Sequence, residues 1–233
     1  ICHVAYATIF QKGVFNVGTP VLIMGKSGSG KSTSLRNFGE NEILLINVSR
    51  KPLPFRKRFN TAINTDKYSE IARAMTKLNC ENPKVKTVVI DDAGYLITNM
   101  FMRGHSAKGT GNAIFGFYND IADRFWRMID YIYTLPQDVI VYILMHEECN
   151  DMGEYKPKTI GKILDEKVCL EGMFTIVLRC ITQDGKHYFK TKTDGTDVSK
   201  SPPDMFSSEL IDNDLKAVDT AIREYYELGG ILK

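Results

Sequence analysis

The chain has 233 residues, of which 43% are hydrophobic and 25% are charged. This length suits one α/β domain with a substantial core and is too short for two nucleotide-binding domains, so we expect a single domain over residues 1–233. The net charge of +2 excludes a broadly basic protein, so binding to nucleic acid requires a local cluster of cations. The longest apolar run, Val139 to Met145, is too short to cross a bilayer, and we expect no membrane contact.

The chain has five cysteines, an odd number without a Cys-x-x-Cys pair. This pattern indicates neither a disulfide framework nor a zinc site. We therefore expect buried free thiols and a reducing, cytoplasmic location.

Apolar runs, helical periodicity and turn residues predict the elements of the chain in order. In the first half they are a strand at 21–24, the start of a helix at 32–38, a strand at 43–48, a helix at 68–78 and a strand at 88–90. In the second half they are a loop at 101–112, a helix at 114–132, a strand at 139–145, a polar loop, a β-hairpin at 174–192, and a helix with Asn213 as its cap and Gly229 as its stop. Pro52 and Pro54 exclude regular helix from residues 50–58.

Apolar strands that alternate with amphipathic helices imply a mostly parallel sheet with helices on both faces. The hairpin near the end of the chain implies an antiparallel edge. We therefore expect an α/β fold whose ligand-binding residues lie at the carboxyl ends of the strands.

A glycine-rich segment after the first strand matches the pattern G-x-x-x-x-G-K-[ST] in full. Small residues let successive backbone N–H groups surround a β-phosphate, and the helix that follows adds the partial charge of its N-terminus. We expect Lys31 to reach the β- and γ-phosphates and Ser32 to complete Mg²⁺ coordination. The segment thus predicts a site for ATP with Mg²⁺, formed by Gly25, Lys26, Ser27, Gly28, Ser29, Gly30, Lys31, Ser32 and Thr33.

Acidic and polar residues follow two other predicted strands. Asp91 is placed to hold Mg²⁺ through its waters, and Asp92 to orient or deprotonate the attacking water. His146 is placed to sense the γ-phosphate, and Glu147 is a second candidate for the catalytic carboxylate. The alternative for each residue is a polar side chain that only forms hydrogen bonds within a turn or with solvent.

The phosphate loop, the acidic pair and a third strand with a polar end resemble the RecA-like branch of P-loop ATPases. The segment Lys-Pro-Leu-Pro-Phe at 51–55 is similar to phage-encoded ATP-binding proteins of single-strand annealing and recombination, the Sak group. The resemblance covers residues 21–203. It implies a RecA-like core that acts as a homo-oligomer in the host cytoplasm, with ATP at subunit interfaces, single-stranded DNA in a central groove and a single-strand binding protein as a further partner.

The resemblance also bears on particular residues. Lys190 and Lys192 match the Lys-x-Lys pattern with which RecA-like subunits reach a neighbour's γ-phosphate, although a solvated strand face is the alternative. The loop at 148–165 lies where RecA proteins carry a DNA-binding loop. The chain departs from the family after the second strand, where Asn47-Val48-Ser49 replaces a catalytic glutamate, so hydrolysis is expected to be slow or to depend on Asp92 or Glu147.

Cations concentrate around Phe55, as Arg50, Lys51, Arg56, Lys57 and Arg58. Cations release counterions from nucleic-acid phosphates, and an aromatic ring can stack on a base. We expect Arg56, Lys57 and Arg58 to bind single-stranded DNA, with a solvated loop or a contact with the nucleotide as the alternatives. The segment with Arg103, His105 and Lys108 is a weaker candidate.

Two other functions stay open. A nucleoside or small-molecule kinase also uses one P-loop domain, but such kinases usually carry an arginine-rich lid, and the sequence indicates no acceptor site. A motor or regulatory subunit would bind ATP without contacting DNA. The leading expectation is a phage-type ATPase that binds single-stranded DNA and promotes annealing or strand pairing.

Overall fold

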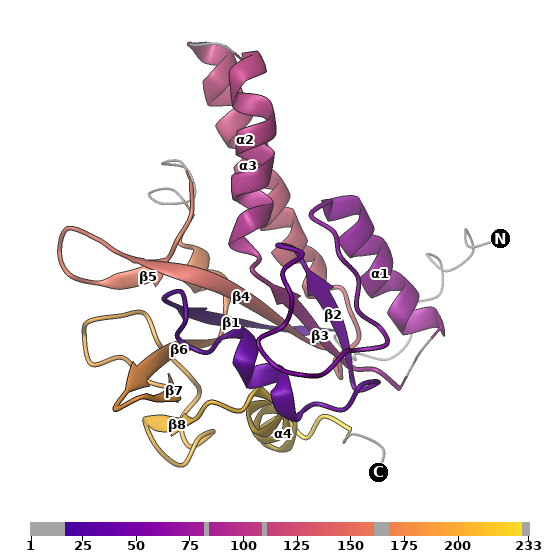
Figure 1. Cartoon of the computed structure of the whole chain (residues 1–233), viewed down its shortest axis with the longest axis vertical. Coiled ribbons are helices and arrows are strands. Elements are labelled where there is room, and N and C mark those ends of the chain that lie inside the picture. Colours follow the sequence, from indigo (N-terminus) through magenta and orange to yellow (C-terminus); the bar gives the residue numbers. More distant parts are fainter. Residues whose placement is uncertain (1–16, 82–83, 109–110, 161–167, 230–233) are drawn as a thin grey trace.

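The computed structural model describes residues 17–81, 84–108, 111–160 and 168–229 (Figure 1). Its strands are β1 (Thr19–Gly25), β2 (Ile43–Asn47), β3 (Thr87–Asp91), β4 (Ile140–Cys149), β5 (Tyr155–Pro157), β6 (Ile176–Gln183), β7 (Lys186–Lys190) and β8 (Leu210–Asp212). They follow the order β2-β3-β4-β1-β6-β7-β8, and β5 pairs with β4. The pairs from β2 to β6 are parallel, whereas β7 and β8 are antiparallel. This arrangement confirms the predicted fold class.

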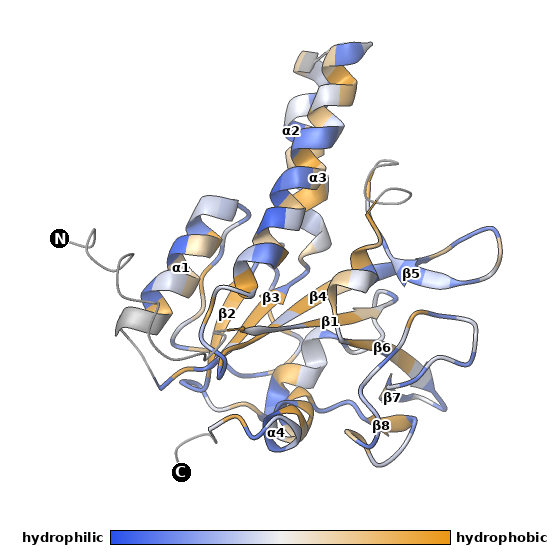
Figure 2. Cartoon of the chain, turned by 180° about the vertical axis from the view of Figure 1, so that it is seen from behind, coloured by the Kyte–Doolittle hydropathy of each residue, from blue (hydrophilic) through white to orange (hydrophobic). Residues whose placement is uncertain are grey.

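Helices cover both faces of the sheet. One face packs against α1 (Tyr68–Glu81), α2 (Gly94–Lys108), α3 (Asn112–Ile132) and the 3-10 helix η3 (Leu170–Met173). The other face packs against the 3-10 helix η1 (Ser32–Asn37) and α4 (Leu215–Tyr225). Figure 2 shows hydrophobic strands between helices of mixed hydropathy. Within the described ranges, no helix is both long enough and apolar enough to cross a membrane.

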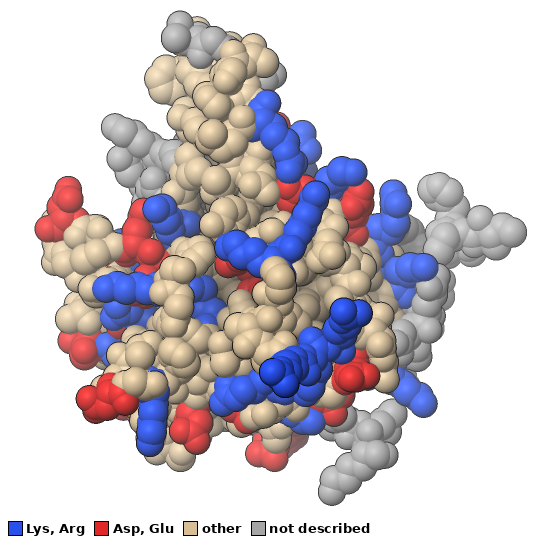
Figure 3. Space-filling model, viewed as in Figure 1, with Lys and Arg blue, Asp and Glu red and all other residues tan. Residues whose placement is uncertain are grey.

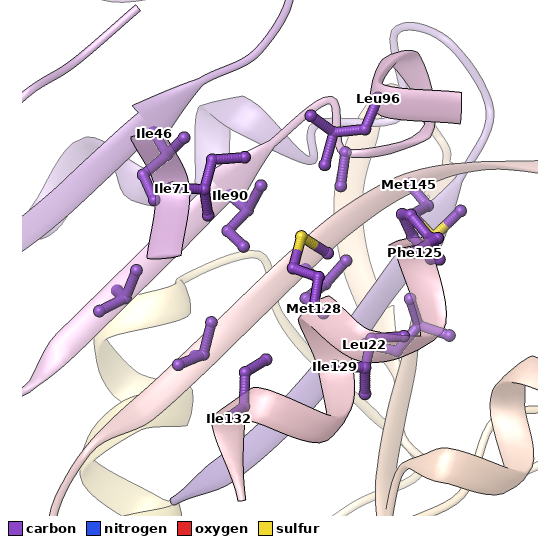
Figure 4. Packing of buried hydrophobic residues seen from close by; sticks show 14 of the residues in the cluster. Leu22, Ile46, Ile71, Ile90, Leu96, Phe125, Met128, Ile129, Ile132 and Met145 are labelled. Atoms are coloured by element: carbon purple, nitrogen blue, oxygen red, sulfur yellow. The ribbon is translucent and has the colours of Figure 1, made fainter. Parts of the chain in front are cut away.

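Two cores form because successive strand residues point to opposite faces of the sheet. Leu22 and Ile90 face the first core, where Phe125, Met128 and Ile129 of α3 pack against them (Figure 4). Their neighbours Val21, Ile23 and Val89 face η1 and α4 instead. Strands β1, β2 and β3 are therefore buried on both sides, and their ends are where polar groups can reach a ligand.

The predicted loop at 101–112 is wrong, because helix α2 extends to Lys108 and α3 begins at Asn112. Gly104 is a packing residue, because a Cβ at this position would meet the ring of Phe117. Residues 109–110 and the side chain of Lys108 lie outside the described part. The two helices form a long hairpin that extends beyond the sheet in Figures 1 and 2.

Three smaller predictions also need correction. The helix after the phosphate loop is a 3-10 helix of six residues. The last helix is capped by Asp214, whose side chain accepts from Lys216 N and Ala217 N, while the predicted cap Asn213 is buried and donates to Cys180 Sγ. That helix ends at Tyr225, before the predicted stop at Gly229.

The predicted loop at 148–165 is partly strand, since β4 continues to Cys149 and pairs with β5. Residues 161–167 lie outside the described part. The expectation of buried thiols holds for Cys180 and is wrong for Cys149 and Cys169, which are exposed. Cys2 and the side chain of Cys80 are not described.

A buried ion pair joins α4 to the amino-terminal ends of β3 and β4. Arg223 Nε lies 2.7 Å from Asp219 Oδ2, and both side chains are almost fully buried. Asp219 Oδ1 also accepts from Tyr142 OH at 3.0 Å and Thr87 Oγ1 at 3.1 Å. Arg223 donates to the carbonyl of Asp138 at 2.8 Å. The network fixes the covering helix to the sheet from the side opposite the strands' carboxyl ends.

Asp219→Ala is expected to lower the free energy of unfolding by about 3–5 kcal/mol, because it leaves the Arg223 guanidinium buried without its carboxylate. Tyr142→Phe removes a single hydrogen bond and should cost about 1 kcal/mol. Urea unfolding measures both. The double variant Asp219→Leu/Arg223→Met removes both charges and should be less destabilised than Asp219→Ala; equal losses would contradict the importance of the unpaired charge.

Candidate nucleotide-binding site

The carboxyl ends of three neighbouring parallel strands meet at one edge of the sheet. Gly25 at the end of β1 pairs with His146 in β4, and Asp91 is the last residue of β3. Because β4 lies between β1 and β3, His146 lies between the glycine-rich loop and the acidic pair. Residues that are distant in the sequence therefore surround one point.

The glycine-rich loop is anchored to β6. A Cβ at Gly25 would lie 2.5 Å from the Cys180 carbonyl oxygen, so only glycine fits this approach. Cys180 Sγ donates to Ser29 O at 2.8 Å, and burial raises the pKa of this thiol to about 11. Gly30 has a φ of +100°, a conformation that L side chains rarely adopt. The loop conformation thus depends on glycine at defined positions.

Lys31 lies beneath this loop with 5% of its surface exposed. Its Nζ donates to Gly25 O and Lys26 O, each at 2.8 Å. Burial lowers the pKa of Lys31, although nearby groups, Asp91 and Asp92 among them, oppose that effect. Since an ammonium group only donates, the 3.4 Å contact with His146 Nδ1 makes that nitrogen the acceptor and leaves the ring proton on Nε2.

Ser32 and Asp91 form the second part of the site. Ser32 Oγ donates to Asp91 Oδ1 at 2.9 Å. Burial and the neighbouring Asp92 carboxylate raise the pKa of Asp91 to about 6. A hydroxyl and a carboxylate are the hard oxygen ligands that Mg²⁺ prefers. This pair is therefore chemically suited to the predicted metal role.

Asp92 has a φ of +58°, the left-handed conformation that Asp tolerates better than most residues. Its Oδ1 lies 3.5 Å from His146 Nε2, and its Oδ2 lies 3.3 Å from Lys51 Nζ. Burial opposes ionisation, but hydrogen bonds from His146 and Ser49 and the Lys51 charge outweigh it and hold the pKa of Asp92 well below its usual range. Asp92 is thus a stabilised carboxylate beside a buried neighbour that ionises reluctantly.

These side chains line a cavity of about 220 Å³. Of the residues predicted from the sequence, the cavity is lined by Ser27, Gly28, Gly30, Lys31, Ser32, Thr33, Asp91, Asp92 and His146. It is also lined by Ser49, Pro52 and Pro54, which the sequence did not assign to it, and by Lys51 of the cation cluster at 50–58, for which a contact with the nucleotide was one of the alternatives. They follow β2, whose carboxyl end is adjacent to that of β3, and this adjacency could have indicated them.

Glu147 does not line this cavity. Its carboxylate accepts from Arg179 Nε at 2.8 Å and Arg179 Nη2 at 3.0 Å, and its side chain is almost fully buried. Arg179 also contacts Asp197 at 3.3 Å. Both carboxylate oxygens of Glu147 are thus bound to an arginine rather than directed at the phosphate loop.

Lys190 belongs to the same charge cluster. Its Nζ lies 2.7 Å from Asp194 Oδ1 and 2.8 Å from Asp197 Oδ2, within its own chain. Lys192 is exposed. The role of both lysines at a neighbouring subunit stays a prediction.

The cations at 50–58 separate into different environments. Lys57 Nζ donates to Arg36 O and Phe38 O, each at 2.6 Å, which binds the end of η1. Phe55 is half-buried and packs edge-on against Phe59. Arg56 and Arg58 are exposed. The weaker candidate Arg103 lies on α2 and pairs with Asp66.

A phosphate loop after β1, an acidic pair at the end of β3 and an intervening strand with a polar end define a P-loop nucleotide-binding core. The profile of an AAA domain family matches residues 18–202, so the chain belongs to this family of AAA domains. No curated protein matches the sequence. Among solved structures, the KaiC-like protein PH0186 from the hyperthermophilic archaeon Pyrococcus horikoshii OT3 is similar, with a TM-score of 0.46 and 14% identity over 79% of this chain and 84% of that one.

The opposite pKa shifts of the acidic pair predict opposite effects on stability without nucleotide. A carboxyl whose pKa rises from 3.8 to about 6 costs about 3 kcal/mol to keep ionised, and this cost appears as the pH rises through that interval. Asp91→Asn should therefore raise the melting temperature at pH 7.5 by several degrees and have little effect at pH 4. Asp92→Asn is the matched variant and should lower the melting temperature at pH 7.5. A carboxylate whose pKa is lowered by folding stabilises the folded state at any pH above its ordinary pKa.

Thermal unfolding followed by circular dichroism at the two pH values measures both variants. A lower melting temperature of Asp91→Asn at pH 7.5 would contradict the conclusion that the Asp91 carboxylate is costly to ionise in the folded protein.

Proposed function

We propose that the chain is an ATPase that binds ATP with Mg²⁺ in the 220 Å³ cavity and hydrolyses it. The observation that carries this proposal is the convergence of Lys31, Ser32, Asp91, Asp92 and His146 on one cavity from the phosphate loop, the end of β3 and strand β4. A glycine loop, a buried lysine, a hydroxyl–carboxylate pair and a second carboxylate are the groups that phosphoryl transfer uses. The AAA domain family of the chain is consistent with this chemistry.

The residues present fit the proposed ligands. The loop offers backbone N–H groups and Lys31 to the phosphates, and Ser32 and Asp91 offer oxygen atoms to Mg²⁺, directly or through water. Mg²⁺ neutralises charge on the phosphates when it is bound. Binding requires Asp91 to be ionised, so nucleotide affinity should fall as the pH drops below about 6.

In the proposed reaction, a water oxygen bonds to the γ-phosphorus while the bond between that phosphorus and the β–γ bridging oxygen breaks. The products are ADP and inorganic phosphate. Asp92 accepts the proton of the water, and His146 Nε2 holds Asp92 in place. The low pKa of Asp92 makes it a weak base, which fits the slow turnover expected when no glutamate follows β2.

Asp92→Asn is expected to lower kcat by about 10²-fold or more and to leave MgATP binding intact, because it removes the proton acceptor and keeps the shape of the side chain. Glu147→Gln is the comparison variant. It breaks the ion pair with Arg179 and should reduce the stability of the protein more than its kcat. Steady-state release of phosphate measures both. A loss of kcat confined to Glu147→Gln would assign the reaction to Glu147 instead.

The more specific proposal is that the ATPase acts as a homo-oligomer on single-stranded DNA and promotes annealing, as the Sak-like segment at 51–55 implies. In its support, Arg56 and Arg58 are exposed and form no hydrogen bond or ion pair within the described residues. Figure 3 shows Lys and Arg side chains across the middle of the face that carries η1 and the loop between β2 and α1. In such an assembly, ATP would lie at subunit interfaces.

Reversing two charges, in Arg56→Glu/Arg58→Glu, should weaken binding to a labelled single strand. It should reduce the slope of log affinity against log salt by about 1.4, since each lost phosphate contact contributes about 0.7. The control Arg73→Glu/Lys186→Glu changes the net charge equally at other exposed cations and should keep the slope. Fluorescence anisotropy measures both. If the wild type does not bind at low salt, with or without ATP, the chain would be an ATPase without DNA contact.

One observation favours a kinase as the second candidate. A cavity of about 460 Å³ shares His146 with the nucleotide cavity and is also lined by Tyr95, Thr98, Glu147 and Lys158. A small acceptor bound there would lie near the γ-phosphate. Transfer of labelled phosphate to a small molecule, in place of its release, would establish this alternative.

A further inference from the structure

We propose that Lys51 binds the γ-phosphate of the nucleotide held by its own chain, so that the cation completing the site comes from the same subunit. This inference rests on the proposed ATP site and adds a residue to it. Lys51 belongs to the cation cluster at 50–58, interpreted in the sequence as a DNA-binding cluster, with a solvated loop or a contact with the nucleotide as the alternatives; the structure singles out Lys51 within that cluster.

The backbone around Lys51 is held from several sides. Asn47, at the end of β2 and almost fully buried, donates its Nδ2 to Lys51 O at 2.8 Å. Arg50 has a φ of +61° and its guanidinium lies 3.4 Å from Asp66. Pro52 then fixes φ and restricts the conformation of Lys51. These contacts hold the backbone of Lys51 in one conformation beside the cavity, which a surface lysine with no specific role would not require.

The side chain of Lys51 is directed at the reacting groups. Its Nζ lies 3.3 Å from Asp92 Oδ2 and 4.9 Å from the centre of the Tyr95 ring. The side chain is 59% exposed, so its ammonium keeps water on one side and can move. It lines the same cavity as Lys31, Asp91 and Asp92. Lys51 thus places a second cation in the cavity, bound to the proposed general base.

The charge balance explains why a second cation is needed. Lys31 Nζ is already bound to the carbonyls of Gly25 and Lys26 at one side of the cavity. A γ-phosphate that approaches Asp92 places two anions together, and like charges at such a distance repel strongly in a partly buried site. The Lys51 ammonium has three donors on a flexible stem and can contact Asp92 and a phosphate oxygen at once. It therefore offsets the repulsion without a neighbouring subunit.

Lys190 would have to leave its own partners to fill the same role. Its Nζ pairs with Asp194 and with Asp197, and Asp197 is only 3% exposed. Withdrawing Lys190 would remove one of the two cations that hold this buried carboxylate. Lys51 requires only a small movement within the cavity.

The test compares nucleotides with and without a γ-phosphate. Isothermal titration is carried out with Mg²⁺ and either ADP or a non-hydrolysable ATP analogue, on the wild type, Lys51→Met, Lys51→Arg and the control Lys67→Met. Lys51→Met keeps most of the stem and removes the charge. Lys67 is a comparably exposed lysine, paired with Glu70 outside the site.

Lys51→Met should weaken the binding of the ATP analogue about tenfold, since a charge-assisted contact with the γ-phosphate is lost. Its affinity for ADP should stay within about twofold of that of the wild type. Lys51→Arg should restore most of the difference, and Lys67→Met should change neither affinity. The preference for the analogue should be the same at low and high protein concentration, because the cation acts within one chain. An equal loss for both nucleotides, or a preference that appears only at high protein concentration, would overturn the inference. Failure of the wild type to bind either nucleotide would instead overturn the proposed function, and the inference with it.

Discussion

Two carboxylates adjacent in the sequence, Asp91 and Asp92, lie buried at the end of β3, and the site around them is organised by the need to accommodate their charge. Asp91 ends a strand that is buried on both faces, so it has little access to water and ionises reluctantly. Asp92 adopts a left-handed backbone conformation that turns the chain, and its carboxylate contacts His146 and Lys51. Lys31 balances the pair from the phosphate loop. A bound metal ion would remove the cost that Asp91 carries in the free protein.

The sheet order makes this arrangement possible. With β4 between β1 and β3, His146 reaches Lys31 with one ring nitrogen and Asp92 with the other. The loop after β2 approaches the same edge and brings Lys51. Its neighbour Arg50 pairs with Asp66, which also binds Asn99 and Arg103 of α2. Adjacent residues of one loop therefore connect the acidic pair to the base of the α2–α3 hairpin.

The strands other than β5 and β8, most helices and the phosphate loop could be predicted because each depends on a local pattern. Apolar runs identified the buried strands, and the spacing of Gly25, Gly30 and Lys31 is fixed by the geometry of the loop itself. The predictions failed where tertiary packing decides the outcome. Gly104 belongs to a helix because the Phe117 ring occupies the space of its missing side chain. Asn213 is directed inward to Cys180, so the helix cap moves to Asp214.

The same limit explains what the sequence left out of the site. Lys51 was assigned with its basic neighbours because the contact with Asp92 joins residues 41 positions apart. The pair of Glu147 with Arg179 likewise joins β4 to β6 across the intervening strand β1, which no local pattern reveals. The central claim is that the cavity above Lys31 holds a nucleoside triphosphate with Mg²⁺. Titration of ATP into the wild type and Lys31→Ala, with and without Mg²⁺, tests it most directly. The account predicts one Mg²⁺-dependent site per chain that is lost in Lys31→Ala, and unchanged affinity in that variant would contradict it.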